Sequence, residues 1–210
     1  MSNPAIAYMS LSNDPMNARR AVVDALNQTY QNSGNTIYLI HQTRQREFYC
    51  DRGINVIHLY REGKWPRLFA EKIDEFLKRV KEPLTAVWDI DDLRHHKYIE
   101  QCLTALGGLD AVTNWRNEQV DGLGFNYTKH RECWGNFFLK TEVLREAFYS
   151  VIARNPSMTD PGNGWVLDTE LRKYIIGHYR VGLHDGIRYF FQGKGTSTAG
   201  RRKGVVLIGD

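Results

Sequence analysis

The first half of the chain alternates apolar runs of strand length with segments of helical periodicity, and this alternation restricts the fold more than any other feature. The predicted strands cover residues 4–11, 35–41, 54–60 and 82–88. The predicted helices cover residues 15–30, 65–80 and 97–106. Strands joined through helices pair in parallel, because each helix returns the chain to the edge where the previous strand began. The sequence therefore predicts an α/β fold, with a mostly parallel central sheet and helices on both faces.

The second half of the chain has a different rhythm. Between residues 108 and 141, short alternating segments are separated by glycines, which is typical of antiparallel strands. Helical spacing returns at 142–153 and 167–177, on either side of a turn-rich loop at 155–164. A chain of 210 residues can bury one sizeable core. We therefore expect a single domain with a smaller antiparallel strand region in its C-terminal half.

Three carboxylates follow the predicted strand at 82–88, namely Asp89, Asp91 and Asp92. In an open α/β sheet, ligands bind beyond the carboxyl ends of the strands, which is where these side chains fall. Like charges this close together raise one another's pKa unless a cation or hydrogen-bond donors hold them. Carboxylate oxygens suit Mg²⁺ or Mn²⁺, which take their other ligands from water and substrate phosphates. The pattern predicts a divalent-cation site, with a solvated acidic loop or a helix cap as the alternative.

Two other enzyme classes place an acidic motif after a strand. In the DxDxT-like motif of haloacid-dehalogenase-type phosphatases, Asp89 would be a phosphorylated nucleophile. That motif normally opens the fold, whereas at least three predicted strands precede it here. A nucleotidyltransferase would share the metal chemistry, but the glycine-rich basic loop expected after the first strand is missing.

A non-catalytic alternative is a nucleic-acid or anion-binding module. The net charge of +4 and the isoelectric point near 8.9 are mildly basic, which weakly favours an anionic ligand. Such a module would use the basic segment at 193–203 together with Arg19, Arg20, Arg44 and Arg46. Its binding should weaken steeply with salt and should not depend on Asp91.

Several motifs together resemble family-2-like nucleotide-sugar glycosyltransferases of the GT-A fold. The first strand and helix contain MSLSNDP and VVDALNQTY, and the metal motif AVWDIDD precedes a helix with the step KYIE. Downstream, GNFFLKTEVL, LDTELRKY and HYRVGLHDG follow in the family's order. The small glycosyltransferase domains that large algal viruses use to build capsid glycans are similar in size and compactness.

The resemblance implies a GT-A-like single domain at 1–192, with a nucleotide-donor half at 1–92 and an acceptor half at 93–192. It implies a hexosyltransferase that moves one sugar from a nucleoside-diphosphate sugar to a hydroxyl of a glycan or glycoprotein, with inversion and with Mn²⁺ or Mg²⁺. A UDP-sugar is the expected donor from the family alone, because the second strand lacks the Asp that commonly binds uridine. Residues 193–210 are expected to form a flexible basic tail that leads to a further domain of a longer chain.

The same resemblance assigns the metal ligands and the catalytic base. Asp91 is the expected direct ligand, Asp89 reaches the donor ribose or the metal through water, and His184 completes the metal shell or contacts the diphosphate. Asp168 matches the position of the base that takes the proton from the acceptor hydroxyl. The alternative for Asp168 is a helix N-terminal carboxylate stabilised by the helix dipole.

The expected donor-binding residues come from four segments of the chain. They are Ser10, Ser12 and Asn13 for the nucleotide, Lys64 and Arg67 for the diphosphate, and Trp134 for the sugar. The alternatives are ordinary polar residues at a strand end for Ser10 and Ser12, solvated charges for Lys64 and Arg67, and a core position for Trp134.

Three features of the sequence bear on cellular location. No apolar run is long enough to cross a bilayer, and residues 1–15 lack the pattern of a secretory signal. The three cysteines are odd in number and far apart, which argues against a disulfide framework. These features favour a cytoplasmic protein.

Overall fold

The computed structural model describes most of the chain in ten segments. These are residues 3–12, 15–41, 55–60, 68–89, 93–113, 117–121, 124–128, 134–160, 164–183 and 189–191.

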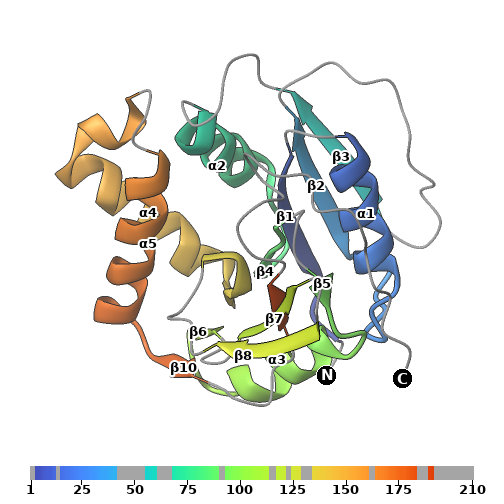
Figure 1. Cartoon of the computed structure of the whole chain (residues 1–210). Coiled ribbons are helices and arrows are strands. Elements are labelled where there is room, and N and C mark those ends of the chain that lie inside the picture. Colours follow the sequence, from blue (N-terminus) through green and yellow to red (C-terminus); the bar gives the residue numbers. More distant parts are fainter. Residues whose placement is uncertain are drawn as a thin grey trace.

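A seven-stranded sheet with the order β10-β6-β9-β4-β1-β2-β3 forms the centre of the molecule (Figure 1). Its strands are β1 (Ile6–Ser12), β2 (Thr36–His41), β3 (Asn55–Tyr60), β4 (Leu84–Val87), β6 (Ala111–Thr113), β9 (Phe138–Lys140) and β10 (Val181–Leu183). Strand β9 runs antiparallel to both β4 and β6, whereas the other neighbours pair in parallel. The mostly parallel central sheet predicted from the sequence is confirmed.

Helices cover both faces of this sheet because residues along each strand point alternately to opposite sides. In β1, Ile6 and Tyr8 pack toward one core with residues of α1 (Pro15–Leu26) and α3 (Tyr98–Leu106). Ala7 and Met9 pack toward the other core with residues of α2 (Leu68–Arg79), α4 (Thr141–Arg154) and α5 (Gly164–His178). The sheet therefore has two apolar cores, one on each face.

Local signals in the sequence explain where several helices begin and end. Pro15 occupies the first position of α1, where its missing N–H is not needed. Gly107 follows the last residue of α3 with φ of 43°, a left-handed conformation that a side chain would disfavour. Helix α5 begins at Gly164, three residues before the predicted start, and a 3-10 helix, η2 (Pro156–Thr159), occupies part of the predicted 155–164 loop.

A second sheet has the order β5-β11-β7-β8. Its strands are β5 (Leu93–Arg94), β7 (Asn117–Asp121), β8 (Gly124–Thr128) and β11 (Tyr189–Phe191). The β7–β8 hairpin confirms the predicted antiparallel region. Strands β5, β10 and β11 were not predicted, because two- and three-residue strands carry no measurable periodicity.

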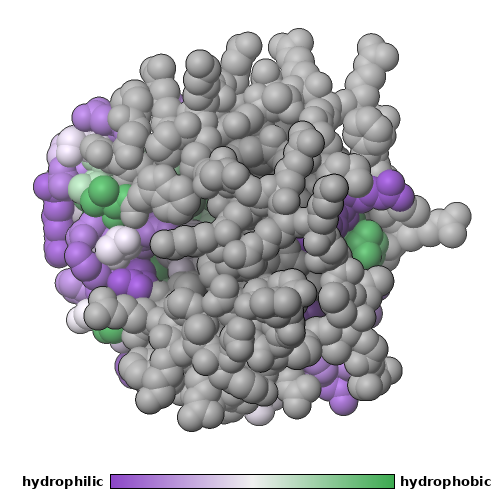
Figure 2. Space-filling model, in the orientation of Figure 1, coloured by the Kyte–Doolittle hydropathy of each residue, from purple (hydrophilic) through white to green (hydrophobic). Residues whose placement is uncertain are grey.

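The described surface over α4 and α5, at the left in Figure 2, is mainly hydrophilic with small, separate hydrophobic areas. No described helix is both long enough and apolar enough to cross a membrane. The predicted tail at 193–210 lies outside the described residues.

Candidate functional site

The carboxyl ends of β1 and β4 lie side by side in the middle of the main sheet. Met9 is paired with Val87, and the backbone N–H of Trp88 donates to the carbonyl of Met9 at 2.8 Å. Asp89 therefore leaves the sheet next to the last residues of β1, with a half-buried side chain. This is the edge at which open α/β sheets bind ligands.

Trp88 anchors this end of β4 in the core. Its indole N–H donates to the carbonyl of Ala21 in α1 at 3.1 Å, and its ring meets Tyr8 edge-on with 4.8 Å between centroids. Both contacts use a fully buried side chain. Asp89 is thus attached to a residue that packing and a hydrogen bond hold in place.

An ion pair between Asp24 and Arg94 is buried beside Trp88. Arg94 Nη1 lies 3.5 Å from Asp24 Oδ2, and the Arg94 side chain is 0% exposed. The guanidinium lies 4.0 Å from the centre of the Trp88 ring, a cation–π geometry. Burial raises the pKa of Asp24 to about 6, and the positive charge of Arg94 opposes that rise.

The short helix η1 (Trp134–Asn136) lies against the ends of β4 and β6 at the same edge. The backbone N–H of Val87 donates to the carbonyl of Phe137 at 2.9 Å, and Thr113 Oγ1 donates to Asn136 Oδ1 at 2.6 Å. The Tyr98 hydroxyl donates to the Asn136 carbonyl at 3.1 Å. Consequently the turn that carries Trp134 is held against the ends of two central strands.

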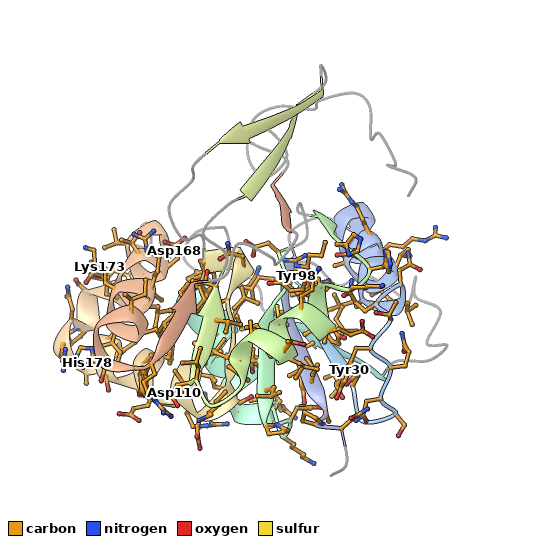
Figure 3. The ribbon with its side chains drawn as sticks, turned by 90° about the horizontal axis from the view of Figure 1, so that it is seen from below. Tyr30, Tyr98, Asp110, Asp168, Lys173 and His178 are labelled. Atoms are coloured by element: carbon orange, nitrogen blue, oxygen red, sulfur yellow. The ribbon has the colours of Figure 1, made fainter. Side chains whose placement is uncertain are left out.

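Helix α5 brings Asp168 to this edge because it packs against η1. Leu167 immediately precedes Asp168 and Leu171 follows it by three residues, and both belong to the same core cluster as Trp134. Figure 3 shows Asp168 at the end of the molecule nearer the β7–β8 hairpin, with Asp110 and His178 at the opposite end. The geometry places Asp89, Trp134 and Asp168 at one edge of the sheet.

The environment of Asp168 shifts the pKa of its carboxyl upward. The carboxyl is half-buried, and this burial raises its pKa, although a hydrogen bond from Thr169 Oγ1 at 3.0 Å and the charge of Arg172 act in the other direction. Because α5 begins at Gly164, Asp168 lies beyond the first helical turn, where the helix dipole has little effect. The helix-dipole alternative therefore explains little about this residue.

The structure describes the side chains of four predicted site residues, Ser10, Asp89, Trp134 and Asp168. Ser10 is fully buried, and its hydroxyl has no hydrogen-bond partner among the described atoms. Trp134 is 7% exposed and packs against Phe69 and Phe137, which agrees with the core alternative but leaves its role toward a sugar untested.

The remaining predicted site residues are described less fully or not at all. Ser12 is described only as the last residue of β1. Asn13, Lys64, Arg67, Asp91 and His184 lie outside the described residues. Their assignments stay predictions.

A divalent cation is compatible with the chemistry of this edge. Asp89 supplies a half-buried carboxylate beyond the end of β4, and Mg²⁺ commonly needs only one or two such ligands from a protein. Among the residues that the structure describes, no group of three or more His, Cys, Asp or Glu side chains is arranged to hold a metal ion. The donor set at Asp89 fits a metal that takes its other ligands from water and phosphate.

Sequence reasoning missed Asp24 and Arg94. Asp24 lies in the run AVVDAL of a predicted helix and Arg94 lies in the polar run LRHHK, and a single charged residue in either context is normally exposed. Only the approach of α1 to β5 buries the two side chains together. The usable signal was a single carboxylate within the otherwise apolar run AVVDAL.

Comparison by sequence finds no matching family model and no matching curated protein. By structure, the chain is similar to TarS 1–349 from S. aureus, with a TM-score of 0.63, 8% identity, and coverage of 90% of this chain and 60% of that one. The same TarS fragment in complex with UDP-GlcNAc gives a TM-score of 0.60 at 9% identity, and covers 91% of this chain and 59% of that one.

The mannosyltransferase PcManGT from Pyrobaculum calidifontis, in complex with GDP-Man and Mn²⁺, is similar with a TM-score of 0.60 and 12% identity. That likeness covers 90% of this chain and 57% of PcManGT. The chain therefore spans less than two thirds of the length of either protein. At such identities the likeness establishes the fold, and the fold is the GT-A-like α/β fold that the sequence predicts.

Proposed function

We propose that this protein is a metal-dependent glycosyltransferase that uses a nucleoside-diphosphate sugar. The observation that supports it most is the position of the acidic segment: Asp89 begins it at the carboxyl end of a central strand, in a fold similar to proteins solved with UDP-GlcNAc and with GDP-Man and Mn²⁺. The first fact concerns the position of this chain's own residues, and the second concerns the overall fold.

The proposed donor site is the edge formed by the ends of β1 and β4. Asp91 holds the cation directly, and Asp89 and His184 complete its surroundings. When bound, the cation neutralises negative charge on the leaving nucleoside diphosphate. Ser12, Asn13, Lys64 and Arg67 bind the nucleotide and its diphosphate, and a uridine nucleotide is the expected one.

Asp168 is the proposed general base. It takes the proton of the acceptor hydroxyl while that oxygen bonds to the anomeric carbon and the bond from this carbon to the diphosphate oxygen breaks, with inversion. Its raised pKa suits this role, since a base is most effective when its pKa approaches the working pH. The acceptor is a hydroxyl of a glycan or glycoprotein, bound by the half of the chain at 93–192.

Nucleotide binding with and without metal tests the proposal. Isothermal calorimetry with UDP, GDP, UDP-sugars and GDP-sugars should detect binding of one nucleotide class in the presence of Mn²⁺ and little binding in EDTA. Asp91→Ala should abolish the metal-dependent part, whereas Asp160→Ala, an exposed carboxylate in the turn after η2, should leave it unchanged.

Three results would contradict the proposal in different ways. Nucleotide binding that is independent of metal would remove the cation from the proposed site. Binding of nucleic acid that falls steeply with salt and survives Asp91→Ala would favour an anion-binding module. A covalent phosphate on Asp89 after incubation with a phosphate monoester would favour a phosphatase.

A further inference from the structure

The side chain of Arg94 connects three backbone segments at the candidate site. Nη1 donates to the carbonyl of Asp89 at 3.2 Å, and Nη2 lies 3.4 Å from the carbonyl of Val87 and 3.2 Å from the carbonyl of Gly135. Val87 is the last residue of β4, Asp89 follows it by two residues, and Gly135 is the middle residue of η1. One guanidinium thus joins the strand end that carries Asp89 to the turn that carries Trp134.

The shape of the guanidinium is suited to these contacts. Its planar fork can donate in several fixed directions, whereas a lysine ammonium is a single point on a flexible chain. The same plane stacks on Trp88 at 4.0 Å, and Asp24 balances its charge from 3.5 Å. The three carbonyls stand at the end of β4 and in η1, and Arg94 supplies a donor to each.

Arg94 also belongs to the second sheet. Its backbone pairs with Tyr189 at the start of β11. Arg94 therefore contacts the segments that hold Asp89 and Trp134 through its side chain, and the start of β11 through its backbone.

We infer that Arg94 is a positioning residue, which holds the Asp89 segment against the Trp134 turn so that metal-dependent donor binding requires its guanidinium although Arg94 itself touches no ligand. This inference rests on the proposed function. A purely structural ion pair would also be buried and paired. It would, however, support stability without affecting the affinity for metal and nucleotide.

Arg94→Lys separates the two roles, because it keeps the positive charge beside Asp24 and removes the fork. The matched control is Thr85→Val, which removes a buried hydrogen bond of β4, from Thr85 to Thr141 at 2.8 Å, near the opposite end of the strand. Both variants should lose stability, Thr85→Val by the smaller amount because it removes a single hydrogen bond. Calorimetry should show Mn²⁺-dependent nucleotide binding weakened about 10- to 100-fold in Arg94→Lys, the range seen when outer-shell partners of metal ligands are changed. Thr85→Val should bind like the wild type.

Hydrogen exchange of the ligand-free protein gives a second readout. In Arg94→Lys, amides of 84–89 and of 134–138 should exchange faster together, while in Thr85→Val the amides of 134–138 should keep wild-type rates. Should Arg94→Lys not fold, the double variant Asp24→Asn/Arg94→Gln removes both charges at once and leaves no unpaired ion in the core. It should show the same loss of metal-dependent binding.

The outcomes distinguish this inference from the function on which it rests. If the wild-type protein shows no Mn²⁺-dependent nucleotide binding, the proposed function fails and the inference fails with it. If the wild type binds and Arg94→Lys binds equally tightly, only the inference is overturned. It is also overturned if Thr85→Val loses as much affinity as Arg94→Lys, because general destabilisation would then explain both.

Discussion

The two edges of the main sheet differ in how fully their polar groups are hydrogen-bonded. At the amino-terminal edge, Asp110 precedes β6 and accepts hydrogen bonds from Lys140 Nζ at 2.8 Å and from the backbone N–H and Nε of Arg180 at 3.1 and 3.3 Å. These contacts tie together the starts of β6 and β10 and the end of β9. Figure 3 shows Asp110 at this edge, far from Asp168.

At the carboxyl-terminal edge, several polar groups are buried without full compensation. The Ser10 hydroxyl and the Trp134 indole N–H have no hydrogen-bond partner in the described part of the chain. Burial raises the pKa of both Asp24 and Asp168. The difference indicates that one edge of the sheet is arranged for stability and the other for chemistry, since polar groups held at a free-energy cost are typical of functional sites.

Asp168→Asn should have the largest effect on activity and almost none on stability. Asparagine keeps the size and one hydrogen-bond acceptor of the carboxyl but cannot take a proton. We expect a 10²- to 10⁴-fold loss of sugar transfer, the usual contribution of a general base, measured as release of nucleoside diphosphate in the presence of acceptor. Calorimetric donor binding should stay at the wild-type level. Transfer at the wild-type rate would remove Asp168 from the mechanism.

Lys72 provides a second contrast, because α2 follows β3 and its second turn lies toward the carboxyl-terminal edge. The side chain is fully buried, and burial lowers its pKa to about 7. The unfolded chain therefore binds more protons than the folded one between pH 7 and 10.5. The free energy of unfolding should rise from pH 7 to 9 by about 2 kcal/mol from this group.

Lys72→Met should remove most of that rise, as measured by urea unfolding at pH 7, 8 and 9. The wild type at the same pH values is the control. A variant whose stability rises with pH as steeply as that of the wild type would show that Lys72 is charged and compensated in the folded protein.

Asp110→Asn should reverse the pattern expected for Asp168. The paired cations hold the pKa of Asp110 well below its ordinary value, so its contribution is present above pH 4 and is lost as pH falls through the lowered folded-state value. Since the Arg180 side chain is largely exposed, we expect a loss of only about 1 kcal/mol at pH 7. Chemical unfolding at pH 7 and pH 3 measures it, and the difference in stability between the variant and the wild type should be smaller at the lower pH. Loss of sugar transfer without loss of stability would contradict the division between the edges.

Thr85 and Thr141 test the amino-terminal half of β4 more finely. Thr141 Oγ1 donates to the carbonyl of Glu82 at 2.7 Å, so the buried Thr85 hydroxyl must donate in the 2.8 Å contact between the two side chains. Thr85→Val removes one hydrogen bond and should destabilise by about 1 kcal/mol. Thr141→Val should destabilise by about twice as much, because it also leaves the Glu82 carbonyl unsatisfied. Equal effects in the two variants would contradict this donor assignment.

Much of the fold could be predicted because its signals are local. Helix α3 lies within one residue of the predicted range, and β2 and β3 each begin one residue late and end as expected. Antiparallel strands were predicted in the region of β9, but the place of β9 in the main sheet could not be predicted, since its pairing with β4 and β6 depends on partners that are distant in sequence. The same applies to β10 and β11, which are too short to have a period of their own.

The site divides in a similar way. The sequence indicated Asp89 because carboxylates after a strand can be recognised from a few neighbouring residues, and it indicated Asp168 through the resemblance of LDTELRKY to a family motif. It did not indicate that Trp134 would be buried beside Phe69, or that Asp24 and Arg94 would meet in the core. Whether a charged side chain is buried depends on the residues packed around it, and those residues come from several helices and strands.

The sequence by itself determined the alternation of strands and helices, the two apolar faces of β1, and the acidic segment that ends β4, because each depends on the spacing of neighbouring side chains. Only the tertiary structure decided which of the many charged residues are buried. Asp110 remains a partner of surface cations, while Arg94 is enclosed between Trp88, Asp24 and three carbonyl groups. That choice depends on how α1, β4, β5 and η1 pack against one another, and the contacts among them join residues that are far apart in the chain.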